Sequence, residues 1–236
     1  MYYSLRSVQN QKMKEIEIIF VDDCSTDNSP TIIKKYMKED QRIRLIQNKE
    51  NRRILYSKSF GALNAKGKYI IQLDQDDLFI RDDVFDILYN EAEKLELDLV
   101  QIRDIIKDDF YFSNITQVNN ENQHLIFAKK THLKIGTENI NKLFTNQYNF
   151  LLWGLLIKTD IYKKTIYLLW PIIINYKIKF QEDYIITFMI VILTKRYKYI
   201  NNFALIHLNH PNSTSSNFDT KNEFYLGIFF ALNILI

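Results

Sequence analysis

The chain has 236 residues, of which 47% are hydrophobic and 25% charged, so it can bury the core of a globular domain. Its formal net charge of +3 is small, and no dense run of Lys and Arg stands out, which argues against a nucleic-acid-binding protein. The single cysteine, Cys24, excludes an intramolecular disulfide and a cysteine-based zinc site.

The first 103 residues alternate between strand-like and helix-like segments. Apolar, β-rich runs predict strands at 15–21, 42–48, 68–74 and 97–103. Helical spacing of apolar residues predicts helices at 31–40, 56–67 and 82–95. This alternation predicts an α/β fold, with a mostly parallel sheet and helices on both faces.

The pattern loosens after residue 104. Residues 150–164 are apolar and then helix-like, and 178–193 predict a buried helix because they are apolar on all sides. Residues 1–14 lack the apolar centre of a signal peptide, and no run reaches the roughly 18 apolar residues of a membrane-spanning helix. Without repeats or a clear linker, we expect one cytoplasmic domain over 1–236.

Acidic residues follow two of the predicted strands. Asp22 and Asp23 end the first, and "QLDQDD" places Asp74, Asp76 and Asp77 at the end of the third. Ligands bind at the carboxyl ends of strands in such sheets, and carboxylates together with substrate phosphates suit Mg²⁺ or Mn²⁺. Each motif alone is equally compatible with a turn that caps the next helix.

Two further places carry candidate functional residues. Glu182 and Asp183 precede the buried helix, where they are either partners of the helix dipole or a general base. His207 opens a predicted polar loop over 207–219, where it is either solvated or a metal or phosphate contact.

Taken together and in order, these segments resemble the family 2 inverting glycosyltransferases, which use nucleotide-sugars and have the GT-A fold. "IEIIFVDDCSTDNS" (16–29) resembles the family's first acidic signature, "SFGALNAKGKYIIQLDQDD" (59–77) its Asp-x-Asp strand, and "FQEDYI" (180–185) its Glu-Asp motif. The resemblance covers most of the chain and is strongest over 4–103.

The resemblance implies a role for each matching residue. Asp22 and Asp23 would hold the uracil and ribose of a UDP-sugar. Asp74 and Asp76, with Asp77 beside them and His207 as a weaker candidate, would bind Mn²⁺ or Mg²⁺ on the diphosphate. Asp183 would be the base that deprotonates the acceptor hydroxyl for inversion, with Glu182 as its neighbour.

The resemblance also divides the domain and names its partners. Residues 1–103 would form the nucleotide-sugar-binding half and 104–236 the acceptor-side half. The partners would be a nucleotide-sugar donor and a glycan or lipid-linked acceptor. Peripheral contact with a membrane surface is an alternative to a purely cytoplasmic location.

The chain departs from the family pattern at three places. The family's first strand and its turn have no counterpart before residue 1, so we expect that strand to be missing. Cys24 stands where Gly is common, and Lys58-Ser59 stand where Arg-Asn is common.

Two alternatives to a transferase remain. The departures leave open a catalytically inactive, nucleotide-binding relative. An Asp-nucleophile phosphatase would use Asp74 as nucleophile and Asp76 as acid, but it leaves Asp22 and Asp23 without a role.

Overall fold

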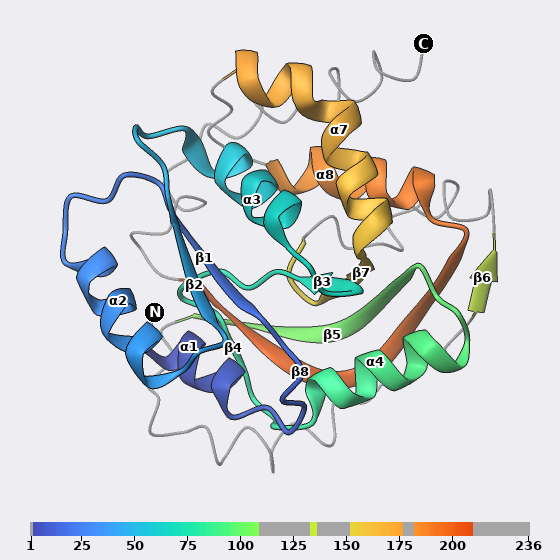
Figure 1. Ribbon diagram of the computed structural model, residues 1–236. Helices are drawn as coiled ribbons and strands as arrows, with labels where there is room; N and C mark the ends of the chain where they lie inside the picture. The colour runs from blue at the N-terminus through green and yellow to red at the C-terminus, as the bar shows by residue number, and fades with distance from the viewer. Residues whose placement is uncertain (1, 109–132, 136–151, 177–181, 210–236) are drawn as a thin grey trace.

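The computed structural model describes residues 2–108, 133–135, 152–176 and 182–209 (Figure 1). The helices of this part of the chain are α1 (Tyr2–Gln9), α2 (Ser29–Glu39), α3 (Arg53–Asn64), α4 (Val84–Lys94), α7 (Thr159–Asn175) and α8 (Glu182–Leu193). Its strands are β1 (Ile18–Asp22), β2 (Ile43–Gln47), β3 (Tyr69–Ile71), β4 (Leu78–Phe79), β5 (Leu99–Asp108), β6 (Leu133–Ile135), β7 (Leu155–Lys158) and β8 (Arg196–Asn209).

The strands form two sheets. β1 and β2 pair in parallel as a two-stranded sheet. The six-stranded sheet has the order β3-β7-β5-β8-β4, with β6 paired to β8. In it only β5 and β8 are parallel among the described strands. The α/β class is confirmed, but the expectation of a mostly parallel sheet is wrong in the described part, because β7 returns antiparallel between β3 and β5.

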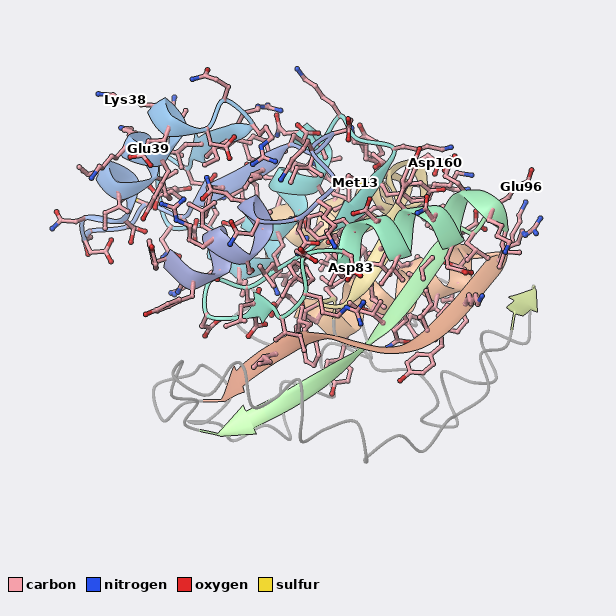
Figure 2. The ribbon with its side chains drawn as sticks, turned by 90° about the horizontal axis from the view of Figure 1, so that it is seen from below. Met13, Lys38, Glu39, Asp83, Glu96 and Asp160 are labelled. Atoms are coloured by element: carbon pink, nitrogen blue, oxygen red, sulfur yellow. The ribbon has the colours of Figure 1, made fainter. Side chains whose placement is uncertain are left out.

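Helices cover both faces of the six-stranded sheet, as the sequence predicts. Alternate residues of β5 show this, because Leu99 packs into a core with α3, α7 and α8 whereas Val100 packs into a second core with α4. In Figure 1, α3, α7 and α8 lie on one side of the sheet and α4 on the other. Figure 2 shows α4 beside β5 and β8, with Asp83 at its start and Glu96 just past its end.

A third, smaller core lies under the two-stranded sheet. Leu5 of α1, Ile33 of α2 and Ile43 of β2 are its buried members. The amphipathic pattern of 31–40 is thereby explained, since α2 buries one face against β2 and leaves the other to solvent.

The expected boundaries differ most where the acidic motifs lie. The predicted strand 68–74 is shorter, because β3 covers Tyr69–Ile71 and an isolated bridge joins Gln72 to Trp153. The helix predicted within 178–193 is confirmed as α8, and most of its residues are buried. Across the described residues, no helix combines the length and apolar character needed to span a bilayer.

Candidate active site

The segment Asp74–Asp77 forms a tight turn beyond β3. The amide of Asp77 donates to the carbonyl of Asp74 at 3.1 Å. Ser4 of α1 supports the turn, since its Oγ lies 2.7 Å from the carbonyl oxygens of both Gln75 and Asp77 and can donate to one at a time. Asp77 is fully buried, whereas Asp74 and Asp76 remain half-buried and accessible to a ligand.

Glu182 and Asp183 open α8 and are both buried, with 6% and 7% of their surface exposed. Acids in the first turn of a helix are stabilised by its dipole, which fits the simpler interpretation of these two residues. Burial of two adjacent carboxylates nevertheless needs a compensating charge.

Lys58 of α3 supplies that charge and joins the two acidic motifs. Its Nζ donates to Glu182 Oε1 and Asp183 Oδ1, each at 2.9 Å, and lies 3.3 Å from Asp74 Oδ1. The structure thus brings together Asp74, expected to bind metal, and Asp183, expected to be the base, although 109 positions separate them in the sequence.

The electrostatics of this cluster follow from its burial. Desolvation alone would lower the pKa of Lys58, but Asp183, Glu182 and Asp74 together raise it well above its usual value. Burial raises the pKa of Asp183 to about 7, against the opposing effect of the Lys58 ammonium. A carboxyl with this pKa is suited to accept a proton near neutral pH.

Asp22 and Asp23 hold the loops at the ends of β1 and β2. Asp22 accepts hydrogen bonds from the amide of Ser25 and from Gln47, both at 3.1 Å. Burial alone would raise the pKa of Asp22, but the hydrogen bonds from Ser25 and Gln47 bring it below its usual value.

The Asp23 carboxylate is similarly engaged. It accepts from Asn48 Nδ2 at 2.9 Å and from the amides of Arg52 and Arg53 at 2.7 and 2.8 Å. Asp23 therefore shapes the start of α3, whereas Asp22 bonds to the loop after β1 and to the end of β2. The role in nucleotide binding that the resemblance implies stays a prediction for both acids.

Helix α3 connects the loops held by Asp22 and Asp23 with the cluster around Lys58. Its first residue, Arg53, donates to Asp23, and Lys58 follows five residues later, about 8 Å along the helix axis. Gly61 lets α3 approach β1 closely, because a Cβ there would lie 3.0 Å from Cγ2 of Val21. The small residue thereby sets the distance between the helix and the strand that ends in Asp22 and Asp23.

The turn has the donor chemistry for a hard divalent cation. Asp74 and Asp76 offer carboxylate oxygens, and the ammonium of Lys58 shows that Asp74 can accommodate a positive charge. No group of three or more metal-binding side chains occurs among the described residues. Mg²⁺ commonly binds through one or two carboxylates plus substrate phosphates, so this donor set fits such a cation.

The structure gives less support to Asp77 and His207 as metal ligands than to Asp74 and Asp76. Asp77 is turned into the protein with none of its surface exposed, which favours Asp74 and Asp76 over it. The prediction of a loop is wrong at His207, because its backbone pairs with Ile106 in β8; its side chain falls outside the described residues.

Lys58 is the residue of this cluster whose contacts sequence reasoning missed. A signal for it exists, since Lys58 shares a helix face with the buried residues Leu55 and Ala62, three positions before and four after it. Lysine is rarely buried without a partner, so its place on an apolar face indicates nearby acids.

With this geometry in view, comparison with known proteins assigns the family. The model of the family described as "Glycosyl transferase family 2" matches residues 1–163, and the chain belongs to this family. This confirms the resemblance that the acidic motifs indicate.

Individual relatives match the chain to different extents. Glycosyltransferase GlyG of Streptococcus pneumoniae is 34% identical over 93 residues, covering 39% of this chain and 31% of that protein. Cholesterol galactosyltransferase of Borreliella burgdorferi is 25% identical over 236 residues, covering 95% of this chain and 60% of that protein.

Solved structures confirm the fold. S. aureus TarS 1–349 in complex with UDP-GlcNAc superimposes with a TM-score of 0.74 at 16% identity, covering 99% of this chain and 62% of that one. The described architecture is therefore the GT-A type. The chain spans less than two thirds of each of these three proteins.

Proposed function

We propose that this chain carries the donor and base sites of a metal-dependent glycosyltransferase. It would transfer a sugar from a UDP-sugar to a hydroxyl of a glycan or lipid-linked acceptor, with inversion. The observation that carries the proposal is the convergence of Asp74 and Asp183 on one buried ammonium. The UDP-GlcNAc bound to TarS supports a UDP-sugar donor, and the name of the Borreliella relative supports a lipid acceptor.

Each group would have a defined part in the reaction. Asp22 and Asp23 would bind the nucleoside, and Asp74 and Asp76 would hold Mn²⁺ or Mg²⁺, with Asp77 supporting the turn. A bound divalent cation neutralises charge on the departing diphosphate. Asp183 would take the proton of the acceptor hydroxyl, whose oxygen attacks the anomeric carbon as the bond to UDP breaks. A single displacement of this kind inverts the anomeric centre.

Release of UDP tests this function. The wild-type protein, Asp76→Ala and Asp183→Ala are incubated with Mn²⁺, a panel of UDP-sugars and glycan or lipid acceptors. We expect turnover in the wild type and losses of at least about a hundredfold in both variants, because each lacks a group used in the transition state. Exposed Asp160→Ala on α7 is the matched control and should keep full activity.

The stereochemistry of the product provides the second readout. NMR of the anomeric proton should show the configuration opposite to that of the donor. Equal UDP release by all four proteins, or a product that retains the donor configuration, contradicts the proposal.

A further inference from the structure

Lys58 has no part in the reaction as proposed above, although it contacts Asp74 of the acidic turn and the two acids at the start of α8. An ammonium carries three N–H donors, and three carboxylates from two separate segments surround this one at 2.9 to 3.3 Å. We infer that Lys58 is a positioning residue that holds Asp183 and Glu182 in place and competes with the divalent cation for Asp74. This inference rests on the proposed function of the same site.

The positioning role follows from burial. The side chains of Lys58, Glu182 and Asp183 are 13%, 8% and 11% exposed, so water screens their charges poorly. Without the ammonium, two adjacent buried carboxylates would repel each other, so one of them would take up a proton or turn toward solvent. Lys58 therefore fixes the start of α8 against α3 and keeps Asp183 at a defined place.

Competition for Asp74 follows from the charge balance. Once Asp183 has lost its proton, three carboxylates and one ammonium leave two negative charges in the cluster, which one divalent cation would neutralise. The cation and the ammonium would both approach the Asp74 carboxylate, and like charges a few ångströms apart repel each other. Lys58 thus weakens cation binding at Asp74 while it orients the base.

These two effects predict that Lys58→Met changes Mn²⁺ affinity and turnover in opposite directions. Loss of the ammonium should tighten Mn²⁺ binding about tenfold, because the cluster becomes more negative. The same change should lower turnover at least about a hundredfold, because Asp183 loses the contact that orients it. A residue with only a structural role would weaken Mn²⁺ binding and turnover together.

The test measures Mn²⁺ binding without nucleotide, by the EPR signal of free Mn²⁺, and turnover by UDP release. Lys58→Arg should change both readouts less than Lys58→Met does, because it keeps the positive charge although its planar guanidinium donates in a different geometry. Lys163→Met is the matched control, since Lys163 Nζ donates to a backbone carbonyl, that of Ala65, at 2.7 Å. Circular dichroism verifies that each variant is folded, and Lys58→Gln replaces Lys58→Met if the latter does not fold.

The outcomes separate this inference from the proposed function. Mn²⁺ binding that is unchanged or weaker in a folded, uncharged Lys58 variant overturns the competition. Unchanged turnover in that variant overturns the positioning role. If no protein, including the wild type, releases UDP, the proposed function fails, and the direction of the Mn²⁺ shift still decides the competition.

Discussion

At the scale of single residues, backbone conformation explains one departure from the family pattern. Cys24 has a φ of +63°, in the left-handed region that L-residues with a Cβ adopt at a cost. Its side chain is exposed, and its thiol lies 4.0 Å from the carbonyl of Lys49, so little compensates for this conformation. Glycine is common at this place in the family that the chain resembles, and the positive φ gives the physical reason.

Cys24→Gly should therefore stabilise the protein. We expect a gain of about 0.5–1 kcal/mol in the free energy of unfolding and a rise of about 1–4 °C in the melting temperature. Thermal unfolding followed by circular dichroism measures the change. Ser25→Gly is the control, because Ser25 lacks a positive φ and should lose stability on the same substitution. A melting temperature of Cys24→Gly below that of the wild type contradicts this account.

The buried charge of Asp183 makes a second prediction at this scale. Burial raises the pKa of Asp183 from 3.8 to about 7, so the native carboxyl holds its proton more tightly than the unfolded one. The stability from this proton is complete below about pH 4 and is lost as the pH rises through 7. At pH 8 the native state carries the full cost of the buried charge.

Asp183→Asn removes that cost. We expect the variant to exceed the wild type in unfolding free energy by about 1–3 kcal/mol at pH 8, and by less at pH 5. Urea unfolding at both pH values, without added metal, measures the difference. Asp160→Asn on the exposed start of α7 is the control for the loss of one charge. Lower stability of Asp183→Asn at both pH values would mean that its ion pair with Lys58 outweighs the burial.

At the scale of elements, the position of α3 depends on its contact with β1. The hydrogen on Gly61 leaves room for Val21 Cγ2, which a Cβ would meet at 3.0 Å. This close approach places Arg53 beside Asp23 and Lys58 beside Asp183 on one helix. Packing of α3 against β1 thus connects the region around Asp23 with the region around Asp183.

A double-mutant cycle tests this contact. Alanine favours helix by about 1 kcal/mol over glycine, so Gly61→Ala would stabilise α3 if space allowed. We expect the crowding against Val21 to cancel that gain in the wild type and the gain to reappear in a Val21→Ala background. Urea unfolding of the four proteins should give a coupling of about 1 kcal/mol. Additive changes contradict the packing account.

The elements also show what could be predicted from the sequence. Helix α4 and strands β1 and β2 carry strong local periodicity, and they form within a few residues of the expected bounds. Strand β3 ends at Ile71 rather than at the expected residue 74, because periodicity does not register the hydrogen bond that Ser4, some 70 positions away, donates to the turn. Local patterns predict elements well and their ends poorly.

At the scale of the whole molecule, the order and direction of the strands depend on pairing between distant segments, which the sequence pattern does not predict. β7 lies antiparallel between β3 and β5, and β8 runs parallel to β5, so the later half of the chain completes the sheet. Nothing in the local pattern of 150–209 specifies these partners. The contacts of Lys58 with residues 124 and 125 positions away are hidden for the same reason.

The binding of UDP with and without Mn²⁺ tests the central claim, that the acidic turn and the start of α8 form one donor and base site. Isothermal titration of wild type, Asp76→Asn and Asp183→Asn separates binding from chemistry. We expect Mn²⁺ to tighten UDP binding at least about tenfold in the wild type and in Asp183→Asn, because both keep the turn. In Asp76→Asn the Mn²⁺ effect should be lost. UDP binding that ignores Mn²⁺ in the wild type, or responds equally in Asp76→Asn, would contradict the account.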